Sequence, residues 1–202
     1  MNLEKNPLLL IYQRFFDLIL ISFLILICSP IILAVSILVL LFDGRPIFFS
    51  QTRIGKNSIK FQIYKFRTMT IHEEKGIHTT IKNDFRVTKL GTILRKYKLD
   101  ELPQLINVII GNMAVVGPRP TVQSDFNKMD KIQKGRVNVK PGLTGWAQVN
   151  GNTSLKWSER IILDLEYINL KSWLFDAYIL ALTLKKLILG RIHSDPPSSG
   201  EW

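Results

Sequence analysis

The chain has 202 residues, which is enough for one sizeable domain and an anchor. Its net charge of +11 comes from 27 lysines and arginines against 16 acidic residues. This balance suits nucleic acid, an anionic membrane surface or phosphorylated substrates. The single cysteine, Cys28, excludes an intramolecular disulfide and a cysteine-based metal site, and the three scattered histidines lack the spacing of a zinc site.

An almost wholly apolar segment runs from Phe15 to Phe42. As a helix it would rise about 42 Å, more than the ~30 Å hydrocarbon core of a bilayer, so it belongs in a membrane. Ser29 and Pro30 interrupt it, because proline removes a backbone hydrogen bond and clashes with the preceding turn. A kinked spanning helix and a re-entrant helix both remain open, and proline kinks favour the spanning one. The excess of positive charge after the segment predicts a cytosolic main domain under either interpretation.

The next clear pattern is the alternation of Ile59, Phe61 and Ile63 with polar residues, which predicts a strand. The strand runs into Lys65 and Arg67, whose side chains lie on one face of an extended chain. Two cations at a strand end could bind a diphosphate or could form a solvated edge. Residues 71–83 are polar and lack periodicity, so we expect a loop there.

Two adjacent carboxylates, Asp100 and Glu101, follow a cluster of cations that includes Arg95. Pro103 is tolerated only in the first turn of a helix, so we expect a helix to begin at or just before Asp100. Its buried stripe would consist of Leu102, Leu105, Ile106 and Ile109. At this helix start Asp100 is either an N-cap or a carboxylate directed at a phosphoryl group, with Arg95 and a metal ion offsetting the charge.

After a strand expected at residues 113–116, Arg119 lies between Pro118 and Pro120. The two prolines restrict its backbone, which makes either a rigid mount for a phosphate-binding guanidinium or a rigid surface turn. We expect an amphipathic helix over residues 121–135 and an extended piece from Val137. The glycines of residues 142–151 allow a close approach to a ligand, and Trp146 is expected to pack in the core rather than stack on a base.

Two further helices are expected near the C-terminus. The first, Trp157 to Asn169, has a polar face that includes Asp164. The second, Trp173 to Ile192, is apolar, with aromatic residues at its start and lysines near its end. This pattern favours a membrane interface over a core helix.

Five motifs, in this order, resemble those of the small bacterial sugar transferases, also called monotopic phosphoglycosyl transferases. They are Ser29-Pro30 and the segments 65–69, 99–104, 116–120 and 140–149. Each motif is weak alone, but the five in order are specific, and the resemblance extends from Phe15 to Ile192.

The resemblance implies an α+β fold with three parts. Residues 1–43 would be a re-entrant membrane helix with its flank, broken at Ser29 and Pro30, which replaces the spanning helix favoured above. Residues 44–192 would form one compact cytosolic catalytic domain with interfacial amphipathic helices, and residues 193–202 a loose tail. The protein would then be monotopic, on the cytoplasmic face of the bacterial inner (plasma) membrane.

The resemblance also implies an activity: transfer of a sugar-1-phosphate from a UDP-sugar to undecaprenyl phosphate, with release of UMP. This is the first membrane step in making a capsule, O-antigen, exopolysaccharide or glycoprotein glycan. The implied partners are the UDP-sugar, undecaprenyl phosphate and inner-membrane lipids, with no nucleic acid and with a homodimer left open.

By the same resemblance, Asp100 is the nucleophile that forms a covalent aspartyl-phosphosugar intermediate. Glu101 and Asp100 hold Mg²⁺, and Glu101 assists proton transfer. The implied substrate-binding residues are Lys65, Arg67, Arg95, Pro118, Arg119 and Gln148.

Two positions depart from the family pattern: Asn112, where many relatives have Asp, and Asn152, where many have Arg. If that Arg contacts the nucleotide in relatives, this chain must use another residue, for example Arg136 or Lys156. Two rival functions also stay open. One is a non-catalytic, membrane-tethered basic module that binds anionic lipid or nucleic acid, and the other is a glycosyl transferase that forms no covalent intermediate.

Overall fold

The computed structural model describes residues 7–70 and 84–189, so the expected loop at 71–83 and the tail at 193–202 lie outside it. In chain order the helices are α1 (Pro7–Phe42), α2 (Lys89–Lys96), α3 (Leu105–Ile110), α4 (Gln123–Lys128), α5 (Trp146–Val149), α6 (Trp157–Leu170) and α7 (Trp173–Ile188). The strands are β1 (Phe48–Ile54), β2 (Lys60–Phe66), β3 (Ala114–Val116) and β4 (Gly142–Thr144). Short 3₁₀ turns are η2 (Lys56–Ser58), η3 (Leu99–Gln104), η4 (Gln133–Asn138) and η5 (Asn152–Ser154). This is the mixed α+β architecture that the sequence predicts.

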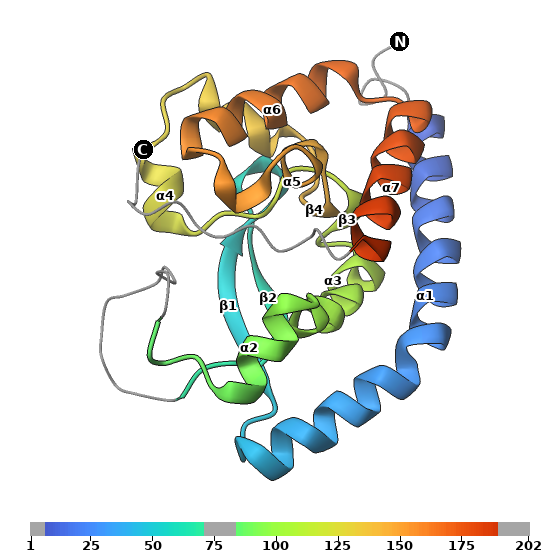
Figure 1. Ribbon diagram of the computed structural model, residues 1–202. Helices are drawn as coiled ribbons and strands as arrows, with labels where there is room; N and C mark the ends of the chain where they lie inside the picture. Colours follow the sequence, from blue (N-terminus) through green and yellow to red (C-terminus); the bar gives the residue numbers. More distant parts are fainter. Residues whose placement is uncertain (1–6, 71–83, 190–202) are drawn as a thin grey trace.

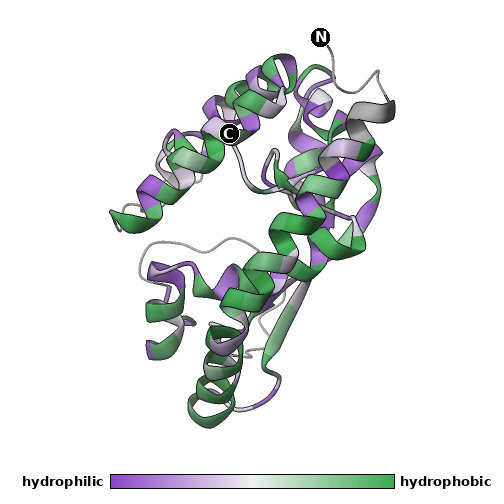
Figure 2. Cartoon of the chain, turned by 90° about the vertical axis from the view of Figure 1, so that its right-hand side faces the viewer, coloured by the Kyte–Doolittle hydropathy of each residue, from purple (hydrophilic) through white to green (hydrophobic). Residues whose placement is uncertain are grey.

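The long helix α1 bends between its two halves (Figure 1). Pro30 lies inside it, and the neighbouring Ser29 hydroxyl donates to the Leu26 carbonyl at 2.9 Å. A proline within a helix is a sufficient cause for such a bend. The stretch Arg14–Phe42 has a mean hydropathy of 3.0 and is long enough to cross a membrane. Figure 2 shows this helix green along most of its length, whereas purple and green alternate over the domain helices.

Both halves of α1 pack against the same domain. In the first half, Ile21 is fully buried in the main core with Val108 and Met113. In the second half, Val35 and Val39 pack with Phe66 and Leu94 in a second core cluster. The helix therefore lies along the domain at both ends instead of leaving it.

Two small sheets form the centre of the domain. Strands β1 and β2 pair antiparallel from Phe48 opposite Phe66 to Ile54 opposite Lys60, and β3 and β4 pair parallel. A bridge between Ile54 and Thr121 links the first sheet to the chain after β3. Strands β2 and β3 confirm the two strands that alternation and apolarity predict.

The predicted helix over residues 121–135 is wrong in its second half. Helix α4 ends at Lys128, because Met129 turns to an extended conformation and is buried. Asp130 and Gln133 then exchange backbone-to-side-chain hydrogen bonds at 2.8 and 3.0 Å, which begins a new turn. Val137 belongs to η4 and not to an extended segment.

The stripe predicted for the helix after Asp100 is also partly wrong. Leu105 is buried, but Ile106 and Ile109 are exposed, and Val108 takes the buried position instead. The cause is η3: a 3₁₀ turn has about 3.0 residues per turn, so it shifts the facing positions relative to a continuous α-helix.

The two C-terminal helices begin at the predicted residues, Trp157 and Trp173; α7 ends at Ile188, before the predicted Ile192, which lies outside the described residues. Trp146 packs against Phe175 of α7, with ring centroids 5.1 Å apart, which confirms packing over base stacking. Helix α7 buries Ile179 but exposes large apolar side chains, including Trp173 at 71%. This exposure is what an interfacial helix requires, and the membrane contact itself stays a prediction.

Candidate active site

Asp100 and Glu101 lie in the first turn of η3, so a helical segment begins where the sequence predicts, but it is a 3₁₀ turn and the α-helix α3 begins only at Leu105. The N-cap position is occupied by Lys98, whose side chain makes no capping bond. Asp100 is therefore inside the turn and is not an N-cap, which removes the simplest structural role for its carboxylate.

The carboxylate of Asp100 is buried, with the residue 6% exposed, and its Oδ1 has no hydrogen-bond partner among the described residues. Burial raises its pKa and the charge of Glu101 adds to this, while Lys65, Lys98 and Arg95 act in the opposite direction. A buried unsatisfied acceptor costs about 1–3 kcal/mol. Such an oxygen is consistent with a group that is held ready for a ligand or a reaction.

Glu101 is in the opposite situation, because two cations hold it. Arg119 binds it with both terminal nitrogens, Nη2 to Oε1 at 2.5 Å and Nη1 to Oε2 at 3.1 Å, and Lys65 Nζ lies 2.8 Å from Oε1. Burial favours the neutral acid, but Arg119 and Lys65 outweigh it and keep the pKa of Glu101 well below its ordinary value. The structure thus brings together three residues predicted for the site, from β2, η3 and the turn after β3.

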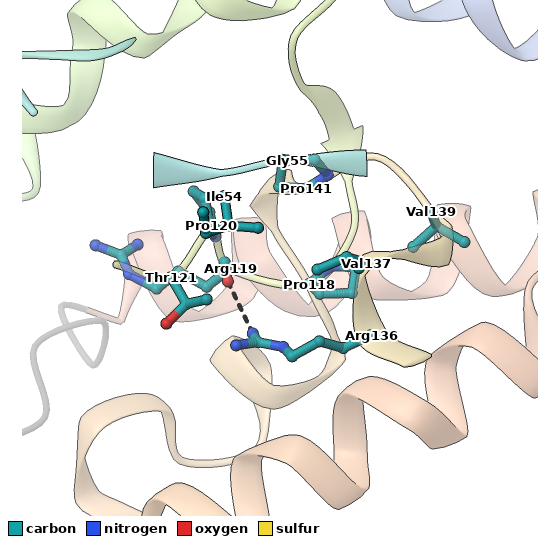
Figure 3. Close-up of a pocket in the computed structure, with 10 residues that line it drawn as sticks. All are labelled: Ile54, Gly55, Pro118, Arg119, Pro120, Thr121, Arg136, Val137, Val139 and Pro141. Atoms are coloured by element: carbon teal, nitrogen blue, oxygen red, sulfur yellow. Dashed lines mark hydrogen bonds between the residues drawn. The ribbon is translucent and has the colours of Figure 1, made fainter. Parts of the chain in front are cut away.

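The backbone of Arg119 is held by the buried ion pair between Arg136 and Asp164. Arg136 Nη2 donates to the Arg119 carbonyl at 2.8 Å and to Asp164 Oδ2 at 2.5 Å. Figure 3 shows that the Arg119 side chain extends away from Arg136, so its carbonyl faces the pair and its guanidinium is left for Glu101. The sequence prediction of Asp164 on a polar face is wrong, because this residue is buried. Arg136, also buried, is not placed to contact a nucleotide.

The pocket drawn in Figure 3 lies beside this turn, between Ile54, Pro118 and Arg136. It has about 10 Å³ of free space, which is room for about one water molecule. It is too small for a nucleotide sugar, and the role of Pro118 in substrate binding stays a prediction.

Arg95 reaches the same region from the last turn of α2. Its Nε donates to the Thr68 hydroxyl at 2.8 Å, and it interacts electrostatically with Asp100. Gly91 makes this approach possible: a Cβ at Gly91 would lie 2.2 Å from the Thr68 carbonyl oxygen. The last turn of α2 therefore depends on a glycine one turn earlier.

The prediction that Arg67 binds substrate phosphate is not supported by its contacts. Its guanidinium is buried and donates to the carbonyls of Asp43, Gly44 and Arg45, just after α1. The sequence shows that Arg67 shares a strand face with Lys65, but not that the end of α1 returns to cover it. Arg67 joins the membrane helix to the end of β2 instead.

Gln148 is in α5, and its Nε2 donates to the Leu143 carbonyl at 3.2 Å. No contact between described residues joins it to Asp100 or Glu101. Its Oε1 is buried without a partner in the described part of the chain. Its predicted role in substrate binding stays a prediction.

Sequence reasoning missed Asn107, which is fully buried. Its Nδ2 donates to the Gln62 carbonyl at 2.6 Å, and its Oδ1 accepts from the Tyr64 amide at 3.2 Å. These two bonds attach α3 to β2 and so fix η3 beside Lys65. The available signal was a single asparagine inside the apolar run Leu105–Ile110.

The described residues include no cluster of three or more His, Cys, Asp or Glu side chains that could hold a metal ion. Mg²⁺, however, is usually bound by one or two carboxylates together with water and substrate phosphates. The unpartnered Oδ1 of Asp100, next to Glu101, fits that kind of site.

The profile of the family described as "Bacterial sugar transferase" matches residues 9–190. The chain belongs to the bacterial sugar transferase family. Among its relatives is the "Uncharacterized sugar transferase EpsL" of Bacillus subtilis, 41% identical over 180 residues, which are 89% of each chain. The "Exopolysaccharide production protein ExoY" of Rhizobium meliloti is 35% identical over 89% of this chain and 86% of its own.

A third relative in this sugar transferase family has an activity in its name. The "UDP-glucose:undecaprenyl-phosphate glucose-1-phosphate transferase" of Escherichia coli is 40% identical over 183 residues. These are 86% of this chain but only 39% of the relative. The present chain therefore spans about two fifths of that longer protein.

Proposed function

We propose that this protein transfers a sugar-1-phosphate from a UDP-sugar to undecaprenyl phosphate and releases UMP, as the first membrane step in building a bacterial glycoconjugate. The relative from Escherichia coli carries the same donor class, acceptor and reaction type in its name. The observation that carries the proposal is the buried, unpartnered oxygen of Asp100 beside a Glu101 that is held by two cations.

In the first proposed step, an Asp100 oxygen attacks the β-phosphorus of the UDP-sugar. A bond forms between that oxygen and phosphorus, the bond from phosphorus to the bridging oxygen breaks, and UMP leaves with the electron pair. Burial raises the pKa of Asp100, so desolvation favours its neutral form, and the nearby cations offset this. A desolvated carboxylate is also a stronger nucleophile than a hydrated one.

In the second proposed step, an oxygen of undecaprenyl phosphate attacks the same phosphorus. The bond to Asp100 breaks, and the carboxylate is regenerated as the lipid-linked diphosphosugar forms. Lys65, Arg119 and Arg95 surround both steps with positive charge, which stabilises the charge that develops on the phosphoryl oxygens.

We also propose that Asp100 and Glu101 hold Mg²⁺ together with the substrate phosphates. When bound, this ion supplies charge neutralisation for the departing UMP. Both oxygens of Glu101 already accept hydrogen bonds from Lys65 or Arg119. Glu101 would therefore share its charge between these cations and the metal, whereas Asp100 Oδ1 has no hydrogen-bond partner among the described residues.

For the location we propose a re-entrant α1 and a monotopic protein on the cytoplasmic face of the inner membrane. The support is that both ends of α1 are bonded to one domain. Near its start, Arg14 donates to the Val108 and Ile109 carbonyls at 2.5 and 2.6 Å. Just past its end, Asp43 accepts from the Thr88 hydroxyl at 3.0 Å. A straight spanning helix would carry one of these ends to the far side of the bilayer.

The two rival functions explain the site less well. A non-catalytic basic module has no use for a buried carboxylate with an unsatisfied oxygen. A glycosyl transferase without a covalent intermediate would need acids that act as a base or metal ligands, and it would never carry labelled phosphosugar on the protein.

The test is incubation of the membrane-embedded protein with Mg²⁺, undecaprenyl phosphate and each member of a panel of UDP-sugars, with UMP as the readout. We expect release with one or a few sugars and none from Asp100→Asn, while the matched change Asp125→Asn on α4 leaves the rate unchanged. A donor labelled in the β-phosphate should label wild type in the absence of acceptor. Equal UMP release by wild type and Asp100→Asn would remove Asp100 from the mechanism.

A further inference from the structure

Lys98 has an unusual backbone for its residue type. It adopts the left-handed conformation, with φ 57° and ψ 20°, which residues other than glycine and asparagine rarely do because their Cβ is crowded there. Its amide donates to the Arg95 carbonyl and its carbonyl accepts from the Glu101 amide, each at 3.2 Å. Lys98 is thus the joint between the end of α2 and the start of η3, and strain of this kind gathers at functional sites.

The side chain of Lys98 belongs to the same site as the carboxylate pair. It is partly buried, and its charge interacts with those of Glu101, Arg119 and Asp100. Burial lowers its pKa, so its ammonium has lost part of its hydration. A partly desolvated cation gains most from an anion that comes to it.

The other cations of the site already have partners. Lys65 and Arg119 bind Glu101, and Arg95 binds the Thr68 hydroxyl. Lys98, by contrast, makes no side-chain hydrogen bond or ion pair with any residue in the described ranges 7–70 and 84–189. Its ammonium is therefore available for a hydrogen bond to a ligand.

The charge balance points to the kind of group that Lys98 meets. The cations Lys65, Arg95, Lys98 and Arg119 outnumber the carboxylates of Asp100 and Glu101, so the site is positively charged even before the proposed Mg²⁺ adds its own charge. A nucleoside diphosphate ester brings about two negative charges at its diphosphate, and a lipid phosphate brings between one and two.

We propose that the Lys98 ammonium binds a phosphate oxygen of a substrate at Asp100 and is a substrate-binding residue of this enzyme. The inference rests on the proposed function. The phosphate can belong to the donor diphosphate or to the acceptor lipid, since both must reach the same carboxylate. The two half-reactions separate these sources, because the first needs only the donor.

Three variants test the role of the charge. Lys98→Met removes the ammonium but retains an unbranched side chain, and Lys98→Arg retains the positive charge. Lys96→Met is the matched control, since Lys96 is exposed two residues away and lies 5.5 Å from the Tyr97 ring centroid. Each is assayed with Mg²⁺, the accepted UDP-sugar and undecaprenyl phosphate, in two stages: UMP release with donor alone, then product formation after acceptor is added.

We expect kcat/KM of Lys98→Met to fall about ten- to a hundredfold, the loss typical of a hydrogen bond to a charged group. Lys98→Arg should retain most of the activity, and Lys96→Met all of it. A loss confined to the donor stage assigns Lys98 to the diphosphate, and a loss confined to the acceptor stage assigns it to the lipid phosphate.

Wild-type rates in both stages for Lys98→Met would overturn the inference and leave the proposed function standing. Equal UMP release by wild type and Asp100→Asn would instead overturn the function itself. If Lys98→Met does not fold, Lys98→Gly takes its place, because glycine adopts the left-handed conformation without strain. A folded Lys98→Gly with wild-type kcat/KM would also contradict the inference.

Discussion

Asp100 and Glu101 are neighbours in the chain, but their surroundings act on a negative charge in opposite ways. Glu101 is held by Lys65 and Arg119, whereas Asp100 is buried with one oxygen left without a partner. The same charge therefore stabilises the fold at one residue and destabilises it at the next. The isosteric changes Asp100→Asn and Glu101→Gln are a matched pair that measures this difference.

We expect Asp100→Asn to raise the free energy of unfolding at pH 7 by about 1 kcal/mol, because it removes a buried charge that burial disfavours. We expect Glu101→Gln to lower it by about 2 kcal/mol, since it leaves Arg119 and Lys65 without their anion. Urea unfolding of detergent-solubilised protein measures both. Changes in the free energy of unfolding that have the same sign for both variants would contradict the difference between the two environments.

The pH dependence of these differences follows from the two pKa shifts. The folded pKa of Glu101 is lowered, so its contribution is present above its ordinary pKa of 4.5 and is lost as the pH falls further. The pKa of Asp100 is raised in the folded protein. The free-energy cost of burying its negative charge is therefore complete only when the pH has risen through this raised pKa. When unfolding is measured from pH 7 down to pH 4, the change in the free energy of unfolding caused by Asp100→Asn should therefore shrink before the change caused by Glu101→Gln.

Sequence patterns proposed Lys65, Glu101 and Arg119 as site residues because charge, a proline pair and a helix start mark them locally, and the structure brings the three into contact. They did not show the buried contacts of Arg67 and Asp164, because the partners of these residues are remote in sequence. Asp164 meets Arg136 28 positions earlier, and Arg67 meets carbonyls more than 20 positions earlier. Periodicity indicates which face of an element a residue occupies, but it does not indicate which distant segment covers that face.

At the scale of elements, the site depends on how closely α2 approaches the chain after β2. Gly91 is inside α2, where alanine would ordinarily add about 1 kcal/mol of helix stability. A Cβ there would lie 2.2 Å from the Thr68 carbonyl oxygen. This oxygen belongs to the backbone, so it cannot move away without displacing the chain. The overlap outweighs the helix preference, because overpacking costs about 1–3 kcal/mol.

We therefore expect Gly91→Ala to lower both stability and the rate of UMP release, since displacement of α2 also moves Arg95 away from Thr68. Gly135→Ala is the control, because its Cβ would meet side chains at ordinary contact distances, Leu165 at 3.5 Å and Asn138 at 3.9 Å. Melting temperature and UMP release measure the two effects. Wild-type behaviour of Gly91→Ala would show that α2 does not set the position of Arg95.

The elements that the sequence predicts well are those with one long and consistent pattern. Helices α1, α6 and α7 and strand β2 are of this kind. The region from η3 to η4 is predicted less well, because its turns are 3₁₀ and are shorter than the periods that the patterns assume. There, side-chain bonds such as those between Asp130 and Gln133 decide where each turn ends.

At the scale of the whole molecule, the attachment of both ends of α1 to one domain predicts a one-sided labelling pattern. In a Cys28→Ser background, cysteines that replace the exposed residues Tyr12 and Ser50 are each treated with a membrane-impermeant maleimide. We expect both to react in inside-out vesicles and neither in intact spheroplasts, where only the outer surface is reached. Reaction of residue 12 from the outer surface would establish a spanning helix.

The three carbonyls that hold Arg67 have a consequence for how the reactants meet. They connect the exit of α1 directly to the end of β2, one residue from Lys65 and without an intervening linker. On the proposed topology, the reacting carboxylate therefore sits at a set height above the bilayer. The lipid reactant then reaches this carboxylate by two-dimensional diffusion within the leaflet, whereas the soluble sugar nucleotide reaches it by three-dimensional diffusion in solution.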